Sequence, residues 1–177
     1  KNTDMILYNS EQTKRTTEEI FPEAKSIANV NAYIISNPVK KQWDNKDDDY
    51  FLYVGNMEKR KGVDLLIKGY LQYKSRGGKK KLILGGKMQE EEINQIVRSA
   101  MMLDEDITYL DYVTHDKKHE LYASMSAFVF PSKAEGFGMP IIEVMRFKKP
   151  IIASNLPIFD EITDGNINTF NIRCNEY

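Results

Sequence analysis

Two carboxylates flank a loop of small residues, and this arrangement is the first sign of chemistry in the sequence. Seven residues separate Glu135 from Glu143, and Gly136, Gly138 and Pro140 lie between them. Glycines let the backbone approach a ligand closely, and proline suits the first turn of a helix, whose N-terminus favours an anion such as phosphate. Carboxylates instead accept hydrogen bonds from hydroxyl groups. A nucleotide sugar carries both phosphate and hydroxyls, and the loop therefore predicts a ligand of this class.

A basic turn earlier in the chain is a second candidate for phosphate binding. Arg60 and Lys61 follow the apolar run 51–54 and precede Gly62, where a helix is expected to begin. Lysine can meet a diphosphate as a flexible point charge, and arginine can bind phosphate through two N–H groups. Alone, such a turn is more often merely solvated. Together with the acidic loop, it predicts a diphosphate site.

Apolar runs that alternate with amphipathic stretches must position these residues. Ser10 is a candidate N-cap for the first helix. The expected strands cover residues 5–8, 33–35, 51–54, 81–84, 108–110, 127–130, 151–153 and 169–172. The expected helices cover residues 11–21, 63–74, 89–103, 117–125 and 139 to 147–149, with one short helical turn in 157–163.

This alternation predicts an α/β fold: a Rossmann-like parallel sheet with helices on both faces. In such sheets, ligands bind beyond the carboxyl ends of the strands. The turn at Lys61 and the loop at Glu135 both follow expected strands. We therefore expect both to lie at the same edge of the sheet.

Composition narrows the classes of protein. A chain of 177 residues is one domain, or one domain with an appendage. The net charge of −1 and the scattered charges argue against nucleic-acid binding. The single cysteine, Cys174, excludes an internal disulfide and suits a reducing compartment, and no apolar run is long enough to span a bilayer. We expect a cytoplasmic location.

Three segments resemble one enzyme family. Residues 135–143 (EGFGMPIIE) resemble the E-x7-E signature of retaining glycosyltransferases of the GT-B fold, in the group-1 or family 4 class. Residues 53–67 (YVGNMEKRKGVDLLI) resemble the first strand, phosphate loop and helix of that family's donor domain. Residues 148–155 (KKPIIASN) resemble the strand after the signature helix, and the resemblance covers roughly residues 50–170.

The resemblance implies a division of the chain into three parts. Residues 1–38 resemble the last strand–helix–strand of the acceptor domain, 39–49 form a polar linker, and 50–177 form the donor domain, cut short at its C-terminus. The implied partners are a UDP- or GDP-hexose donor and a saccharide or lipid-linked acceptor held by the rest of the acceptor domain. The resemblance also implies that the full-length protein can associate peripherally with the inner face of the membrane, and that the isolated chain transfers little sugar.

The same resemblance assigns roles to individual residues. Lys61 and Arg60 stabilise the departing nucleoside diphosphate, Glu135 contacts the transferred sugar, and Glu143 binds the ribose hydroxyls. The remaining donor-binding positions are Gly55 and Asn56 after the first strand of the donor domain, the backbone N–H groups of Phe137, Gly138 and Met139, and the nucleobase region at Tyr112 and Val113.

One position departs from the family pattern. Asn56 stands where many relatives carry an arginine, and a neutral amide cannot offset phosphate charge as arginine does. We expect Arg60, next to Lys61, to supply that charge instead. If it does not, the domain binds its donor more weakly.

Other interpretations of the fold remain open. A nicotinamide or flavin enzyme needs the G-x-G-x-x-G fingerprint, which the segment at Gly85-Gly86-Lys87 lacks. A non-catalytic flavodoxin-like interaction module and an epimerase or phosphorylase on the same fold are further alternatives.

No metal and no cofactor are predicted. His115 and His119 have metal-binding spacing but lack a third ligand, and we expect His119 on a solvated helix face. Residues 47–49, three aspartates, are interpreted as solvated linker.

Overall fold

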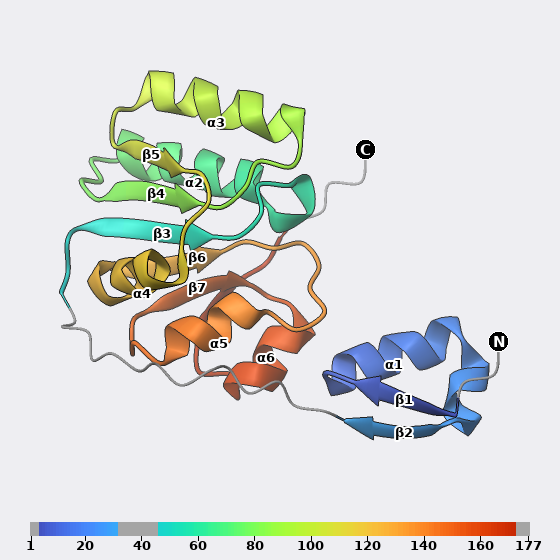
Figure 1. The fold of residues 1–177 in the computed structure, drawn as a ribbon. Coiled ribbons are helices and arrows are strands. Elements are labelled where there is room, and N and C mark those ends of the chain that lie inside the picture. Colours follow the sequence, from blue (N-terminus) through green and yellow to red (C-terminus); the bar gives the residue numbers. More distant parts are fainter. Residues whose placement is uncertain (1–3, 32–45, 173–177) are drawn as a thin grey trace.

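The computed structural model describes residues 4–31 and 46–172, and its main feature is a six-stranded parallel sheet (Figure 1). The strand order is β5-β4-β3-β6-β7-β8, and every neighbouring pair is parallel. The strands are β3 (Tyr50–Val54), β4 (Lys81–Gly85), β5 (Ile107–Leu110), β6 (Ala127–Phe130), β7 (Ile151–Ser154) and β8 (Asn168–Phe170).

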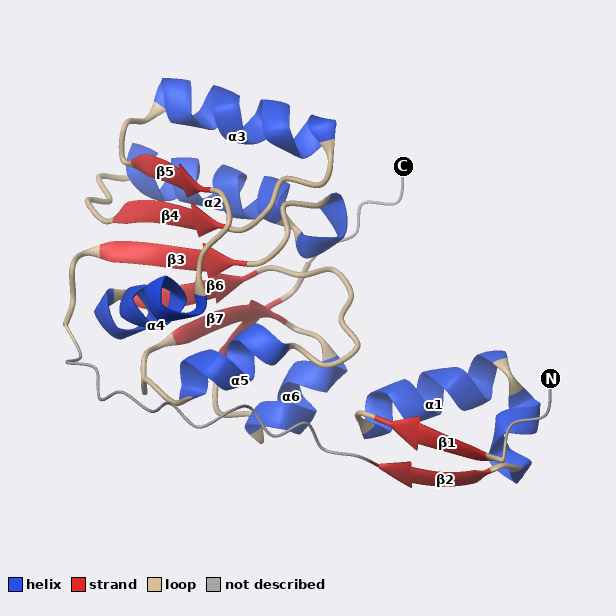
Figure 2. Cartoon of the chain, viewed as in Figure 1, coloured by secondary structure: helices blue, strands red, loops and turns tan. Residues whose placement is uncertain are grey.

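Helices cover both faces of this sheet, as the alternation of elements predicted. The helix α2 (Val63–Ser75) lies behind the sheet and packs against α3 (Glu91–Leu103) (Figure 2). In front lie α4 (His115–Ser124) and α5 (Met139–Met145), and α6 (Pro157–Thr163) packs against α5. Strands covered on both sides must be apolar throughout, which is why runs such as AFVF at β6 carried a clear signal.

The topology changes direction at β3. From β3 the chain proceeds to β4 and β5 on one side, and then returns to place β6 on the other side of β3. The loops that follow β3 and β6 therefore leave neighbouring strands at the same edge. This switch point is where open α/β sheets bind ligands.

The aromatic core extends up to this edge. Tyr53 and Phe130 are fully buried and stack with ring centroids 6.1 Å apart, and Phe159 of α6 packs on Phe130 at 5.8 Å. The Tyr53 hydroxyl donates a hydrogen bond to the backbone oxygen of Asn56 at 2.9 Å, and burial raises the pKa of this phenol. A buried core residue thus holds the loop after β3 in place.

A small N-terminal unit precedes the sheet. The strands β1 (Met5–Tyr8) and β2 (Ala28–Asn31) pair in parallel, and α1 (Glu11–Ile20) and a 3₁₀ turn (Pro22–Ser26) connect them. Ser10 caps α1 as predicted, because its hydroxyl accepts the Thr13 N–H at 2.9 Å. The strand expected at 33–35 lies outside the described residues. The sequence analysis did not predict β2, whose residues ANVN are half polar.

Several element boundaries differ from the prediction by one or two residues, and the end of α5 differs most. The helix α5 ends at Met145 and not at 147–149, because the next bonds, from Phe147 N–H to Val144 O and from Lys148 N–H to Met145 O, span three residues. Lys148 then turns the chain with a φ of 52°. β8 ends at Phe170, two residues earlier than expected.

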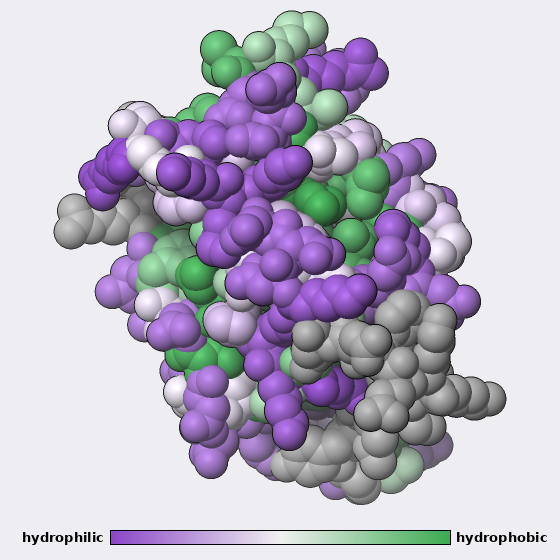
Figure 3. All heavy atoms as spheres, turned by 90° about the vertical axis from the view of Figure 1, so that its left-hand side faces the viewer, coloured by the Kyte–Doolittle hydropathy of each residue, from purple (hydrophilic) through white to green (hydrophobic). Residues whose placement is uncertain are grey.

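The edge where the strands begin is charged. Figure 3 views the molecule from this side and shows a mostly hydrophilic surface with small hydrophobic gaps. The Lys80 ammonium group lies 2.7 Å from the carboxylate of Asp49 and 3.7 Å from that of Asp47. These aspartates are exposed, as predicted, but they are paired with a lysine at the edge opposite the switch point.

Among the described residues, no helix has both the length and the apolar character required to cross a membrane.

Candidate functional site

The site begins where the turn before α2 meets the loop after β6. Gly62 has a φ of 70°, and a Cβ atom at this position would lie 2.0 Å from the backbone oxygen of Pro131. Only glycine fits such a conformation and approach. The Lys133 N–H donates a hydrogen bond to the Arg60 carbonyl at 2.8 Å, which is a second contact between the turn before α2 and the loop after β6.

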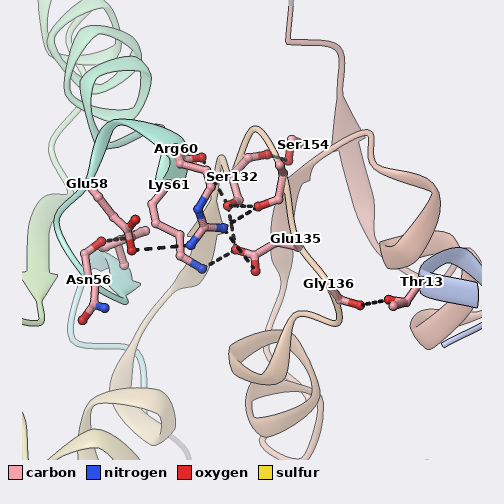
Figure 4. A network of polar contacts seen from close by, with 11 residues as sticks. Thr13, Asn56, Glu58, Arg60, Lys61, Ser132, Glu135, Gly136 and Ser154 are labelled. Carbon is pink, nitrogen blue, oxygen red and sulfur yellow. Dashed lines mark hydrogen bonds and ion pairs between the residues drawn. The ribbon is translucent and has the colours of Figure 1, made fainter. Parts of the chain in front are cut away.

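Lys61 and Glu135 face each other across this junction (Figure 4). The Lys61 Nζ lies 2.5 Å from Glu135 Oε1, and the Ser132 hydroxyl donates to the same oxygen at 2.6 Å. The two side chains are 14% and 9% exposed, so the pair is largely withdrawn from water. Lys61 also lies over the Phe130 ring, 5.6 Å from its centroid. The ammonium group thus contacts both the Glu135 carboxylate and the buried Phe130 ring.

Arg60 lies on the outer side of this pair. Its guanidinium donates to the Ala134 carbonyl at 2.7 Å, and it lies 3.9 Å from the Glu135 carboxylate and 3.5 Å from that of Glu58. The side chain is 47% exposed, so it can reach a ligand from solvent. The structure thus brings together the three residues predicted to be catalytic, and it adds Glu58 and Ser132, which the sequence analysis missed.

The loops after β3 and β4 also meet at this edge. The Gly55 N–H donates to the Gly85 carbonyl at 2.9 Å, and a Cβ atom on Gly86 would lie 2.0 Å from the Gly55 oxygen. The Asn56 carbonyl is held by Tyr53, as described above. Gly55 and Asn56 therefore lie in a backbone segment that is fixed before any ligand arrives.

Glu143 is held by a different group of residues. Its carboxylate lies 2.8 Å from the Lys118 ammonium group and accepts a hydrogen bond from the Tyr122 hydroxyl at 3.0 Å. Burial and the nearby Glu143 charge raise the pKa of Tyr122. Lys118 and Tyr122 are four residues apart on α4, so they lie on one helical face and both reach Glu143.

Residues 137–139 form the turn into α5. Phe137 is only 7% exposed and packs in the core. Gly138 has a φ of 92°, and a Cβ atom there would lie 2.8 Å from the Phe159 ring. Met139 begins the helix. Burial of the Phe137 side chain and the positive φ of Gly138 therefore fix the backbone of this predicted donor-binding loop.

The predicted nucleobase region lies after β5. Tyr112 is 69% exposed, and the Lys87 ammonium group lies 5.6 Å from the centroid of its ring. Val113 is half-buried, and its methyl group would lie 2.9 Å from a Cβ atom on Gly85. Both residues lie at the same edge of the sheet as the Lys61–Glu135 pair. Their contacts are with the end of β4 and the loop after it, and not with that pair.

The expectation for His119 was wrong. Its ring is partly buried, 5.8 Å from the Phe147 ring and 5.1 Å from the His115 ring by centroids. Burial, followed by the charge of His115, lowers the pKa of His119. Across residues 4–31 and 46–172, no cluster of three or more histidine, cysteine, aspartate or glutamate side chains is placed to hold a metal ion.

Curated proteins are similar to this chain in sequence. O-antigen chain mannosyltransferase B of Escherichia coli is 32% identical over 127 residues, which is 71% of this chain and 33% of the relative. An uncharacterized glycosyltransferase of Methanocaldococcus jannaschii is 31% identical over 167 residues, 93% of this chain and 44% of the relative. The chain thus spans less than half the length of these relatives.

Solved structures share the fold. The pneumococcal O-GlcNAc transferase GtfA, in complex with UDP and GlcNAc, superposes with a TM-score of 0.75 at 14% identity, over 99% of this chain and 35% of that one. Anabaena Alr3699/HepE, in complex with UDP and glucose, gives 0.73 at 16% identity, over 96% and 50%. The sequence model described as "Glycosyl transferases group 1" matches residues 36–176. This chain therefore belongs to the group 1 glycosyltransferase family.

Proposed function

We propose that this chain is the donor-binding part of a retaining hexosyltransferase, which uses a UDP- or GDP-hexose. The observation that carries the proposal is the meeting of Lys61 and Glu135 at 2.5 Å. They come from the loops after β3 and β6, at the edge where open α/β sheets bind ligands. One group suits a diphosphate and the other suits sugar hydroxyls.

The reaction breaks the bond between the anomeric carbon and the diphosphate oxygen and forms a bond to an acceptor oxygen on the same face. Negative charge grows on the departing phosphate in the transition state. Lys61 and Arg60 stabilise that charge, which is the form of catalysis that preorganised cations provide. The acceptor proton passes to the departing phosphate, so no protein base is needed. Glu135 holds hydroxyls of the transferred sugar.

The rest of the donor is assigned to the neighbouring loops. Glu143 accepts hydrogen bonds from the ribose hydroxyls, and the region at Tyr112 and Val113 binds the nucleobase. The N–H groups of residues 137–139 hold the distal phosphate and the sugar. UDP in the complexes of two fold relatives supports a nucleotide donor.

The acceptor is assigned to parts of the protein beyond this chain. O-antigen mannosyltransferases among the relatives support a saccharide or lipid-linked saccharide acceptor. We propose that the complete protein works in the cytoplasm, at the inner face of the membrane, and that this chain alone binds nucleotide but transfers little sugar. No metal or other cofactor is part of the proposal.

Calorimetric titration of the chain with UDP, GDP and ADP tests the proposal. Lys61→Ala and Glu143→Ala should each weaken the nucleotide that binds best by about tenfold or more. Lys74→Ala is the matched control, because Lys74 lies on α2 with a carboxylate partner, Asp106, at 2.6 Å, and should leave binding unchanged. No binding by the wild type, or equal binding by all variants, would refute it.

A further inference from the structure

The carbonyl of Gly136 is held by α1, which belongs to the N-terminal unit. The Thr13 hydroxyl donates to this oxygen at 3.0 Å. The Ser10 hydroxyl lies 2.8 Å from the Thr13 hydroxyl oxygen and 3.3 Å from the Gly136 oxygen. Each hydroxyl has one proton to donate, so the shorter contacts form a chain from Ser10 to Thr13 to Gly136. This chain joins α1 to the loop that carries Glu135.

The position of α1 is itself fixed by α6. The carboxylate of Glu161 accepts the backbone N–H groups of Glu11 at 2.8 Å and Gln12 at 3.0 Å. These N–H groups belong to the first turn of α1, where they lack helical partners, and the negative charge suits the helix N-terminus. Thr13 is therefore presented to the loop from a defined place.

The Thr13 contact determines the orientation of one peptide group. Open space surrounds the position of a Cβ atom on Gly136, so side-chain packing does not fix this residue. The peptide between Gly136 and Phe137 is trans and planar, so its N–H points opposite to its carbonyl. With the carbonyl held by Thr13, the Phe137 N–H points away from α1. Figure 4 shows the Glu135 carboxylate on that other side of the loop, facing Lys61.

We infer that Thr13 is a positioning residue for the diphosphate: by holding the Gly136 carbonyl, it aims the Phe137 N–H at the distal phosphate. The inference rests on the proposed function, and it adds a contribution from the N-terminal unit to the donor site. Without the Thr13 hydroxyl, the Gly136–Phe137 peptide can rotate and direct its N–H elsewhere. The contact is selective, because a nucleoside monophosphate has no distal phosphate to receive this N–H.

Calorimetry on the full chain with UDP and UMP, or with GDP and GMP if guanine nucleotides bind, tests the inference. Thr13→Val removes the hydroxyl and keeps the shape of the side chain. It should weaken the diphosphate about tenfold and the monophosphate less than twofold. Thr13→Ser keeps the hydroxyl and should restore wild-type affinities. Thr16→Val makes the same change one helical turn later, on an exposed residue, and should change neither.

The outcomes separate this inference from the proposed function. Equal weakening of diphosphate and monophosphate by Thr13→Val would indicate a general structural role and overturn the inference. Wild-type binding of both would also overturn it, while Lys61→Ala still tests the function independently. Failure of the wild type to bind any of these nucleotides would overturn both. The ¹⁵N-resolved amide signal of Phe137 gives a second measurement, since UDP should shift it in the wild type and shift it less in Thr13→Val.

Discussion

Removing each member of the Lys61–Glu135 pair should have opposite effects on nucleotide binding. The pair can be interpreted in two ways, as a structural ion pair or as a phosphate-binding lysine with a carboxylate partner. Lys61→Met removes the cation and keeps the length of the side chain. Glu135→Gln removes the anion and keeps the hydrogen-bonding shape. The two variants and their combination separate the interpretations.

The structure sets the expected loss of stability. Breaking a buried ion pair by removing one partner costs about 3–5 kcal/mol. Glu135 would keep Ser132 at 2.6 Å and Arg60 at 3.9 Å, so Lys61→Met should cost less, about 2–3 kcal/mol. Glu135→Gln should cost about 1–2 kcal/mol, since the amide oxygen still accepts a hydrogen bond. The double variant should lose less stability than the two single variants added together, because each single variant removes the same contact.

Binding of UDP then distinguishes the roles. Lys61→Met should weaken UDP by about ten- to a hundredfold, the range for a lost hydrogen bond to a charged group. Glu135→Gln should strengthen UDP several-fold, because it removes a competitor for Lys61 and a repulsive charge worth about 1 kcal/mol. UDP carries no hexose, so the proposed contact of Glu135 with the sugar is not lost.

Urea unfolding gives the stabilities and calorimetry gives the affinities. Lys74→Met with Asp106→Asn is the control cycle, because this more exposed pair should couple only weakly and leave UDP binding unchanged. Equal weakening of UDP by Lys61→Met and Glu135→Gln would show that the pair only maintains structure. That result would refute the interpretation of Lys61 as a phosphate-binding lysine.

Three further predictions follow from single contacts. Gly62→Ala should lower the free energy of unfolding by more than about 2 kcal/mol, because the new Cβ atom would clash with Pro131. Gly77 also has a positive φ but lies in open space, so Gly77→Ala should lower it by only about 1 kcal/mol. Urea unfolding measures both variants. UDP should bind more tightly than its 2′-deoxy analogue in the wild type, and Glu143→Gln should reduce this difference in calorimetry. The lowered pKa of His119 means that the unfolded chain binds its proton more readily, so stability should fall as pH drops below about 6.5. His119→Gln should reduce that fall, as measured by urea unfolding at pH 7.5 and 5.5, and an unchanged slope would contradict the assignment.

The inner strands β3, β4, β6 and β7 were predictable because they are largely buried, and their apolar runs were located to within one residue. The edge strand β8 is exposed along its length, and its sequence signal was correspondingly weak. β2 was missed because a two-stranded unit does not impose that pattern. The end of α5 was misplaced because Arg146 and Phe147 are compatible with a helix, and the turn at Lys148 depends on tertiary packing.

The site was predictable as a set of residues and less so as a geometry. The resemblance indicated Lys61, Arg60 and Glu135 together, and the structure places them in contact. It did not indicate that Lys118 holds Glu143, since the two lie 25 positions apart and meet only in the folded chain. The family assignment follows from local motifs, whereas pairings between elements require coordinates.

The pairing of charges in the site bears on how it would act on a donor. Lys61 is already neutralised by Glu135 at 2.5 Å, so a diphosphate competes with a carboxylate for the ammonium group. That competition lowers the net gain from binding the donor in its ground state. In the proposed mechanism, charge grows on the departing phosphate, the balance shifts toward the phosphate, and the lysine contributes more to the transition state than to the bound donor. In the proposed full-length transferase, Glu135→Gln should therefore bind UDP more tightly and yet turn over more slowly. Steady-state kinetics would measure both, and an unchanged kcat would show that the carboxylate has no part in this balance.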